Sequence, residues 1–397
     1  MKKIMILGAS ILQLPAILKA KEMGIEVIAV DMDENAIGFG YADKKLVIST
    51  IDGEKVLEAA KKHKIDGIMT LASDMPMRTV AKVSKALNLI GVTEDTAMKA
   101  TNKALMRQCL LENSVPIPKF FKVNNLDDYL NCISQFDSKI IVKPADNSGS
   151  RGVFLLKDKS DKKNVEYAFK YSKEHSRSGE LVVEEYMEGP EVSVESVCVN
   201  GEVNIIAITD KLTTGEPKFV EMGHSQPSVL SQNIQAEIRK ITKEAIKAIK
   251  LTDGPSHTEI KITNEGPKIV EIGARLGGDN ITTHLVPLST GVDLVKACIE
   301  ISLGIKPNLE KKYDKASVIR YFTNDFGKIL EINGYEDANK INEVKQISFV
   351  KKIGDYLDGI NSSSDRVGFI IAQSENIDKA IEICERAKSL IDIRMER

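Results

Sequence analysis

Short apolar runs alternate with amphipathic stretches of helical length over the first hundred residues. The pattern predicts strands at 4–7, 26–30 and 67–71 and helices at 14–23, 53–63 and 77–87. Strands that alternate with helices are typical of a parallel, doubly wound sheet. We therefore expect an α/β fold that begins with a Rossmann-like domain over residues 1–105.

The pattern becomes richer in strands over residues 106–308. It predicts strands at 139–144, 154–156, 181–187, 191–197 and 203–209, a loop at 211–227, and helices at 231–250 and 285–303. The elements at about 120–187 form a compact subdomain within this second domain. The predicted loop at 211–227 carries Glu221, His224 and Gln226, and loops between sheet elements often carry substrate contacts.

A third unit is expected over residues 309–397. Its pattern predicts strands at 317–322, 327–332, 344–350 and 366–372 and a closing amphipathic helix at 377–391. We find no candidate chemistry in this part of the sequence. A small β-rich domain with a structural or interface role is therefore expected.

The stretch 257–279 carries the most informative chemistry. Two alternating runs flank turn residues at 264–267, which predicts a β-hairpin. Alternation divides the side chains between an apolar face (Ile260, Ile262, Val270 and Ile272) and a second face (Glu259, Lys261, Ile269 and Glu271).

A connecting loop with an odd number of residues would place Glu259 directly opposite Glu271. Two carboxylates in such a pair repel each other unless a cation lies between them, and hard oxygen ligands suit Mg²⁺. Arg275 and the glycines around it would add a guanidinium and room for a ligand. The alternative is a solvated hairpin face with two incidental acids.

A serine- and glycine-rich loop at 146–152 connects two predicted strands, and Lys143 leads into it. Backbone N–H groups in such a loop can surround phosphates. The loop lacks the Gly-Lys-Ser/Thr pattern of a Walker A motif. A flexible hairpin turn is the alternative, and Lys103 taken alone is an ordinary surface lysine.

Composition narrows the function classes. The net charge of −2 gives no electrostatic basis for nucleic-acid binding. No apolar run is long enough to span a bilayer. Five scattered cysteines form no CxxC pair, which fits a reducing cytoplasm better than disulfides or a zinc site. We expect a cytoplasmic protein with small-molecule partners, without nucleic-acid or membrane partners.

A dinucleotide-binding site is the first alternative. Asp31 lies where an acid for the ribose of NAD would lie. The turn after the first predicted strand has Gly8 but lacks the other two glycines of the fingerprint. An NAD enzyme would also leave the motifs between 143 and 279 unexplained.

Taken in order, Lys103, Lys143, the loop at 146–152, the acidic segment 184–191 and the Glu259–Glu271 hairpin resemble the ATP-grasp superfamily, in particular its carboxylate–amine ligases. The resemblance implies a pre-ATP-grasp domain over 1–105, an ATP-grasp domain over 106–308 with its lid at about 120–187, and a C-terminal domain over 309–397. It also implies that a substrate carboxylate attacks ATP to form an acyl phosphate and ADP, after which an amine displaces phosphate.

The resemblance assigns roles residue by residue. Lys103 and Lys143 would contact the phosphates, and Lys143 and Arg275 would be catalytic. The implied nucleotide contacts are Ser148, Gly149, Ser150 and Gly152 in the mobile loop, Glu184, Glu185, Tyr186 and Met187 around adenine, and Glu191 at the ribose. Glu259 and Glu271 would hold Mg²⁺, with Mn²⁺ as a substitute. Gly273 stands where the family usually has Asn, which leaves the number of metal ions open.

The substrate pair is less defined. The residues around 257 and 273–279 look like those of L-amino-acid ligases, which implies substrate contacts at Glu221, His224, Arg275, Gly277 and Gly278. In this scheme Glu221 binds an ammonium group, and Arg275 completes a site for a zwitterion.

The N-terminal domain also resembles those of purine-pathway ligases such as phosphoribosylglycinamide synthetase and phosphoribosylaminoimidazole carboxylase. A phosphoribosyl group would need a basic pocket, and the corresponding residues (Ser10, Gln13, Ser73, Asp74 and Arg78) include a single cation. A catalytically silent nucleotide-binding module, suggested by Gly273, is a third hypothesis. A homodimer is expected from the resemblance alone.

Overall fold

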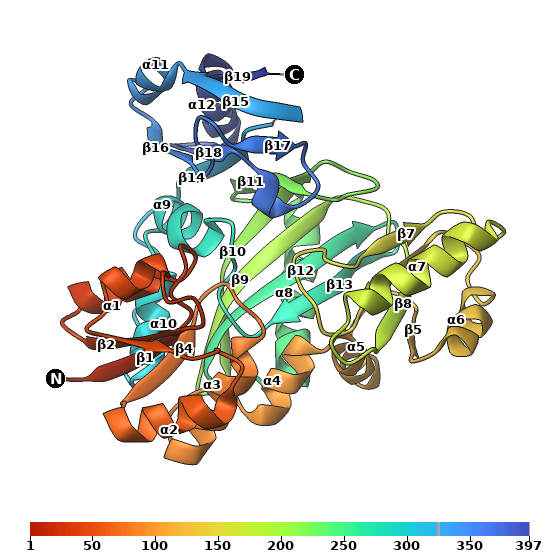
Figure 1. Cartoon of the computed structure of the whole chain (residues 1–397), viewed down its shortest axis with the longest axis horizontal. Coiled ribbons are helices and arrows are strands. Elements are labelled where there is room, and N and C mark those ends of the chain that lie inside the picture. Colours follow the sequence, from red (N-terminus) through yellow and green to blue (C-terminus); the bar gives the residue numbers. More distant parts are fainter. Residues whose placement is uncertain (324–325, 397) are drawn as a thin grey trace.

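The computed structural model describes residues 1–323 and 326–396 (Figure 1). The predicted end of the last domain at residue 397 lies outside the described residues. Three lobes surround a central sheet: the N-terminal domain, the small subdomain around α7 (Lys162–Glu174), and the C-terminal layer (Figure 1). The mixed α/β architecture agrees with the predicted fold class. Within the described residues, none of the helices has both the length and the apolar character needed to cross a bilayer.

The N-terminal domain is a parallel sheet in the order β3-β2-β1-β4. Its elements are β1 (Lys3–Leu7), α1 (Leu14–Glu22), β2 (Glu26–Asp31), η1 (Ile37–Gly40), β3 (Lys44–Val47), α2 (Gly53–His63), β4 (Gly67–Thr70), α3 (Pro76–Leu87) and α4 (Glu94–Thr101). The predicted strands and helices are confirmed, whereas β3 and α4 escaped prediction. Strand β3 lies at the sheet edge and is mostly exposed, so it lacks the apolar run that identifies its buried neighbours.

The lid subdomain is a four-stranded antiparallel sheet in the order β5-β8-β6-β7. It follows α5 (Lys103–Glu112) and consists of β5 (Phe120–Val123), α6 (Leu126–Ile133), β6 (Ile140–Pro144), β7 (Phe154–Leu156), α7 and β8 (Leu181–Glu185). Aromatic and aliphatic side chains from both helices and all four strands form its own core, separate from that of the central sheet.

The central sheet has eight strands in the order β13-β12-β9-β10-β11-β14-β18-β16. Its strands are β9 (Glu191–Val199), β10 (Glu202–Thr213), β11 (Glu221–Gln226), β12 (Gly254–Thr263), β13 (Gly266–Gly273), β14 (Ala316–Tyr321), β16 (Val344–Phe349) and β18 (Gly368–Ser374). Helix α8 (Gln232–Ala248) packs against β13 and β10. The C-terminal strands continue this sheet through the β11–β14 pair.

The prediction of a loop at 211–227 was wrong over most of its length. Strand β10 extends to Thr213 and β11 begins at Glu221, so only residues 214–220 form a loop. The sequence of β11 is polar, yet most of it is buried because the strand pairs with β10 on one side and β14 on the other. Its buried side chains are polar, and Gln226 for example donates a 2.7 Å hydrogen bond to Ser289, so hydrophobic alternation could not reveal the strand.

The single helix predicted at 285–303 is also wrong. The segment contains a π-helical turn η2 (Ile281–Leu285), α9 (Val286–Thr290) and α10 (Leu294–Ser302). Gly291 adopts a φ of 75° and ends α9, and the Asp293 side chain then accepts a hydrogen bond from Lys296 N and caps α10.

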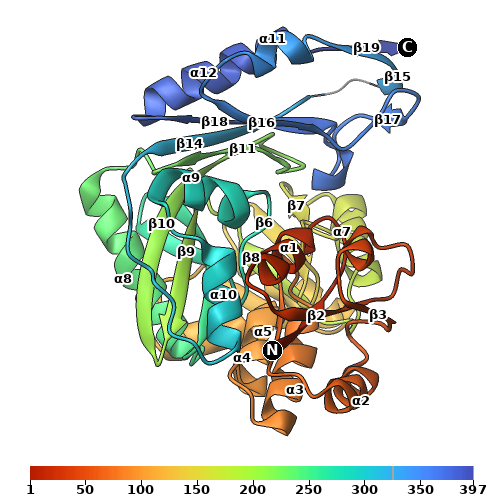
Figure 2. The same ribbon diagram turned by 90° about the vertical axis from the view of Figure 1, so that its left-hand side faces the viewer.

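The C-terminal part adds a second, three-stranded sheet of β17 (Tyr356–Asp358), β15 (Phe326–Asn333) and β19 (Asp392–Glu396). Helix α12 (Ile377–Leu390) packs against β14 and β18 and α11 (Tyr335–Asn339) against α12 (Figure 2). The 3₁₀ turn η3 (Ser363–Asp365) leads from β17 back to β18 and approaches the centre of the molecule.

Candidate active site

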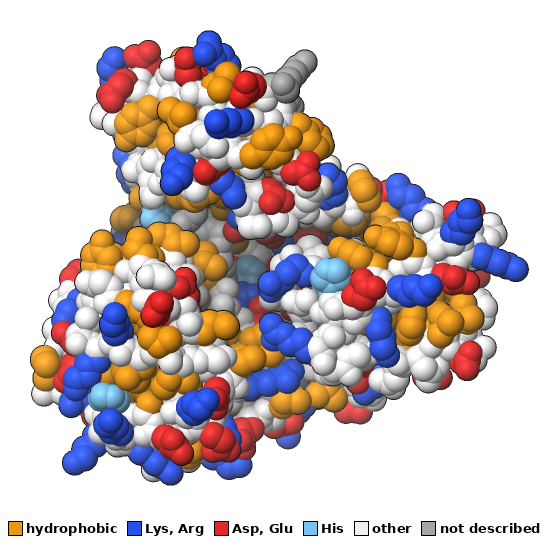
Figure 3. All heavy atoms as spheres, in the orientation of Figure 1, with side chains coloured by type: hydrophobic (Ala, Val, Ile, Leu, Met, Phe, Trp, Pro, Cys, Tyr) orange, Lys and Arg blue, Asp and Glu red, His pale blue; other side chains and the backbone are white. Residues whose placement is uncertain are grey.

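A cavity of about 520 Å³ lies where the lid, the central sheet and the N- and C-terminal domains meet. The surface is hollowed at this junction, and basic side chains line the lid side of the opening (Figure 3). Most predicted site residues line the cavity, namely Lys103, Lys143, Ser148, Gly149, Ser150, Glu184, Glu185, Tyr186, Met187, Glu191, Glu221, Glu259, Glu271 and Arg275. Gly152, His224, Gly277 and Gly278 lie outside this lining.

Glu259 and Glu271 are direct cross-strand partners in the hairpin of β12 and β13. The connecting loop has an even number of residues, because Thr263 pairs with Gly266. The extra residue that brings Glu259 opposite Glu271 comes from a β-bulge between Glu259 and Ile260. The predicted faces of β13 are therefore wrong at two positions. Ile269 pairs with Ile260 and is fully buried, whereas Val270 lines the cavity.

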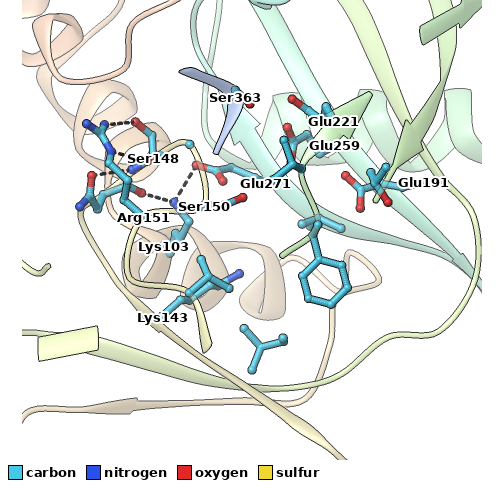
Figure 4. Close-up of a pocket in the computed structure, with 18 of the residues that line it drawn as sticks. Lys103, Lys143, Ser148, Ser150, Arg151, Glu191, Glu221, Glu259, Glu271 and Ser363 are labelled. Carbon is cyan, nitrogen blue, oxygen red and sulfur yellow. Dashed lines mark hydrogen bonds and ion pairs between the residues drawn. The ribbon is translucent and has the colours of Figure 1, made fainter. Parts of the chain in front are cut away.

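The two carboxylates offer hard oxygen donors on one wall of the cavity, which fits the ligand chemistry of Mg²⁺ or Mn²⁺. Glu271 accepts a hydrogen bond from the Lys103 ammonium at 2.8 Å (Figure 4). Glu259 lies 3.1 Å from Lys211 Nζ and 3.5 Å from His257 Nε2. Burial opposes the charge of Glu259, but Lys211 and His257 together hold its pKa well below the usual range.

His257 is fixed from behind by Glu195, whose Oε1 lies 2.6 Å from His257 Nδ1. Burial works against the imidazolium, yet Glu195 and Glu259 raise the pKa of His257 to about 9. Gly277 makes this arrangement possible, because a Cβ at that position would lie 2.6 Å from His257 Nδ1. The predicted substrate contact at Gly277 thus coincides with a packing requirement beneath the cavity wall.

Gly273 makes room for an ion pair between two domains. Asp74, from the segment after β4, accepts hydrogen bonds from Arg275 Nε at 2.7 Å and Nη2 at 3.1 Å. A Cβ at Gly273 would lie 3.2 Å from Asp74 Oδ1 and 3.3 Å from Arg275 Cζ. The departure from the family's Asn therefore accompanies this close Asp74–Arg275 pair. Burial opposes the charge of Asp74, but Arg275 holds the pKa of Asp74 below its ordinary value.

Lys143 and Glu184 belong to a buried network that reaches α5. Glu184 lies 2.7 Å from Lys143 Nζ and accepts a 2.6 Å hydrogen bond from Arg107 Nε. Burial opposes the charge of Glu184, and the two cations hold its pKa at about 2. Burial lowers the pKa of Lys143, with Arg107 and Lys103 adding to the effect and Glu184 opposing it.

Because of this network, the side chains of the predicted adenine segment have different roles from those expected. The Glu184 side chain is occupied by two cations, and Glu185 lies 2.9 Å from Lys268 Nζ. The Tyr186 ring lies 6.0 Å from that of Phe219, between ring centroids. Backbone groups of this segment, with Tyr186 and Met187, are thus the parts left to face a ligand in the cavity.

Arg107 was missed by sequence reasoning. It is fully buried and also donates to the carbonyl oxygens of Ile269 (3.1 Å) and Val270 (2.8 Å), at the bulge that aligns Glu271 with Glu259. The available signal was its position four residues after Lys103, which places both side chains on one face of α5.

The loop at 146–152 lies against the end of α7. Asn147 donates a hydrogen bond to His175 O at 2.9 Å, and Arg151 Nε donates to Ser148 O at 3.0 Å. Gly152 has a φ of 79°, and a Cβ there would lie 2.5 Å from His175 Cβ. Gly152 therefore permits the packing of the loop, while Ser148, Gly149 and Ser150 face the cavity.

The far wall contains a polar cluster that joins the central sheet to the C-terminal domain. His224 is fully buried behind Glu221, with its Nε2 3.4 Å from Asp279 Oδ2. Arg366 donates two 2.7 Å hydrogen bonds to the Asp279 carboxylate and one of 3.1 Å to Glu221 O. Tyr321 stacks 3.7 Å beneath the Arg366 guanidinium and donates to Asp279 O.

Arg366 and the cavity-lining residues 361–363 belong to a region in which the sequence indicated no chemistry. The expectation of a purely structural or interface role for this region is therefore incomplete. Gly278 approaches the N-terminal domain instead, where a Cβ at this position would lie 3.7 Å from Ala72.

The residues behind the two alternative hypotheses have other partners. Asp31 accepts hydrogen bonds from the backbone N–H groups of Ala9 and Asp33, so its carboxylate holds the turn after β1. Arg78, the single cation of the expected phosphoribosyl pocket, donates to Thr101 Oγ1 at 2.7 Å and to Thr101 O at 3.1 Å. Gln13 is buried and donates to Leu71 O.

Comparisons with known proteins identify two domains in this chain. Residues 136–283 match the model of the ATP-grasp domain, and residues 320–396 match that of the L-amino acid ligase C-terminal domain 2. The L-arginine-specific L-amino acid ligase of Bacillus subtilis is 27% identical over 322 residues, which cover 79% of this chain and 76% of that protein.

Two solved structures share the fold over the whole chain. The L-amino acid ligase of Bacillus licheniformis has a TM-score of 0.86 at 21% identity, covering 100% of this chain and 99% of the other. Phosphoribosylglycinamide synthetase of Anaerococcus prevotii has a TM-score of 0.80 at 23% identity and full coverage of both chains. This chain therefore contains an ATP-grasp domain at its centre and an L-amino acid ligase C-terminal domain, and its relatives include L-amino acid ligases and phosphoribosylamine–glycine ligases.

Proposed function

We propose that the protein joins two amino acids through an amide bond, with Mg-ATP converted to ADP and phosphate. The observation that carries this proposal is that Glu221 and Arg275 both line the cavity, since a carboxylate and a guanidinium together suit the two charges of an amino acid. The C-terminal match to L-amino acid ligases supports the same substrate class.

The nucleotide contacts follow from the cavity lining. We propose that Lys103 and Lys143 bind the phosphates, that Ser148, Gly149 and Ser150 cover them, and that Glu191 takes the ribose hydroxyls. The segment from Glu185 to Met187 would receive adenine. Glu259 and Glu271 would hold Mg²⁺ or Mn²⁺, which supplies positive charge at the phosphates when bound.

The chemistry has two steps. A carboxylate oxygen of the first amino acid attacks the γ-phosphorus of ATP, the bond to the ADP oxygen breaks, and an acyl phosphate forms. The amine of the second amino acid then attacks the acyl carbon, the bond to the phosphate oxygen breaks, and the amine proton is released. Lys103, Lys143 and Arg275 act by orienting the groups and neutralising the charge that moves between them.

The proposal is tested by ADP and phosphate release from Mg-ATP with amino acids supplied singly and in pairs, and with phosphoribosylamine plus glycine. Release that requires two amino acids is expected, with one dipeptide formed per ADP. Release only with phosphoribosylamine plus glycine would instead assign a purine-pathway ligase. ATP binding without release under any condition would favour the silent module.

Arg366→Met is expected to raise the KM for the amino-acid substrate about 10-fold while leaving the KM for ATP within about twofold. The variant removes the two hydrogen bonds that hold Asp279 and the one that holds the Glu221 backbone. Steady-state kinetics with each substrate varied separately would measure both constants. Arg394→Met is the matched control, because Arg394 forms an exposed pair with Glu331 in the C-terminal sheet. Equal changes in both KM values would contradict a role confined to the amino-acid end.

All five cysteines are unpaired and buried, which supports our proposal of a cytoplasmic setting. The homodimer stays a prediction.

A further inference from the structure

Lys211 lies at the point where three proposed ligand contacts meet. Its side chain comes from β10 and is 3% exposed. Its Nζ lies 2.6 Å from Glu191 Oε1, 2.8 Å from Glu221 Oε1 and 3.1 Å from Glu259 Oε1. The three glutamates point toward a common region of the cavity (Figure 4). One ammonium group is thus shared by the acids proposed for the ribose, the amino acid and the metal ion.

The topology of the central sheet produces this meeting. Strands β12, β9, β10 and β11 are consecutive neighbours, and each contributes one of the four side chains. Lys211 pairs with His224 on β11, one residue beyond the pairing of Asp210 with Val192 on β9. Its side chain therefore reaches Glu191 at the start of β9, Glu221 at the start of β11, and Glu259 on β12, the strand beyond β9.

The other cations near these acids are distributed unequally. Glu191 also has Lys261 Nζ at 3.3 Å, and Glu259 has His257. Within residues 1–323 and 326–396, Lys211 is the one basic side chain within salt-bridge distance of the Glu221 carboxylate. Three carboxylates this close repel each other, so their orientations depend on the shared ammonium.

We propose that Lys211 is a positioning residue that sets the acids for ribose, metal and amino acid in one arrangement. This inference rests on the ligand assignments of the proposed function. A change at Lys211 should consequently alter all three contacts together, whereas a change at a cation serving a single acid should alter one.

The test uses Lys211→Met with Lys261→Met as the matched control. Calorimetric titration would measure the affinity for ATP and for dATP, and the Mg²⁺ concentration that gives half-maximal ATP binding. We expect Lys211→Met to abolish the preference for ATP over dATP and to raise the Mg²⁺ requirement about 10-fold. Lys261→Met should weaken the ribose preference alone.

The nucleotide measurements need no amino acid, so they test the positioning role of Lys211 even if the protein does not ligate amino acids. With an active amino-acid pair, Lys211→Met should also raise the amino-acid KM about 10-fold. The proposal would be overturned if Lys211→Met changed only one of the three contacts. It would also be overturned if the preference for ATP over dATP and the Mg²⁺ requirement both stayed within about twofold.

A second variant covers the case in which Lys211→Met does not fold. Glu221→Gln keeps Lys211 and the shape of the site, and it should shift the lysine toward Glu191 and Glu259. The expected result is a measurably higher Mg²⁺ requirement, although Glu221 is not proposed as a metal ligand. An unchanged requirement would show that the acids are set independently of one another.

Discussion

Glu271→Gln is expected to slow ADP formation about 10³-fold at saturating substrates. The amide keeps the shape of the side chain but removes the negative charge that faces Glu259 across the hairpin. That charge is proposed to hold the metal ion at the phosphates and to pair with Lys103. The rate of ADP release at saturating Mg-ATP and amino acids measures the effect.

Glu265→Gln is the matched control for this variant. Glu265 lies in the turn of the same hairpin, and its exposed carboxylate pairs with the partly buried Lys268. Its replacement should leave the rate within about twofold, because an ion pair with a solvent-exposed carboxylate contributes little and Lys268 keeps Glu185 as a partner. If Glu271→Gln were as active as this control, the metal assignment would be wrong.

Arg107→Met is expected to lower the free energy of unfolding by about 3–5 kcal/mol, because it breaks a buried ion pair. Glu184 would keep Lys143 as its one remaining cation, and the carbonyls of Ile269 and Val270 would lose their donors. The expected consequence is a bulge that no longer holds Glu271 in register. The midpoint of urea unfolding, followed by circular dichroism, measures the loss.

Arg386→Met makes the same substitution on the exposed face of α12 and should change stability by less than about 0.5 kcal/mol. A similarly small change for Arg107→Met would show that the buried network does not stabilise the fold.

The sequence predicted those parts of the fold that depend on local periodicity. Strand β1 and helix α2 lie within one residue of their expected limits, because their apolar positions follow strand and helix periods and Asp52 caps the helix. Strand β11 had no such signal, since its burial arises from pairing with strands on both sides.

The hairpin shows how far alternation can be taken. Glu259 lies opposite Glu271 only if an odd number of unpaired residues separates them. The sequence did not reveal whether the loop or a bulge supplies the odd residue. The bulge therefore reversed the expected faces of Ile269 and Val270. Such a bulge is held by a distant partner, Arg107, which the local pattern does not contain.

The candidate site divides in the same way. The order of the motifs predicted that Lys103, Lys143 and Glu271 lie in one site, because that order made the fold recognisable from the sequence. All three residues line the cavity. Arg366 was missed because its partner Asp279 lies 87 positions away in the chain. Lys211 was read as a loop residue, and its importance appears only when four strands lie side by side.

The central claim is that an amino-acid carboxylate is activated by phosphoryl transfer before an amine attacks it. The most direct test supplies Mg-ATP and a mixture of amino acids whose carboxylates carry heavy oxygen, and then measures the mass of the released phosphate. We predict that each phosphate contains one heavy oxygen from a carboxylate, in step with dipeptide formation. Dipeptide formed together with unlabelled phosphate would contradict the acyl-phosphate mechanism, and labelled phosphate without dipeptide would contradict the proposed amine.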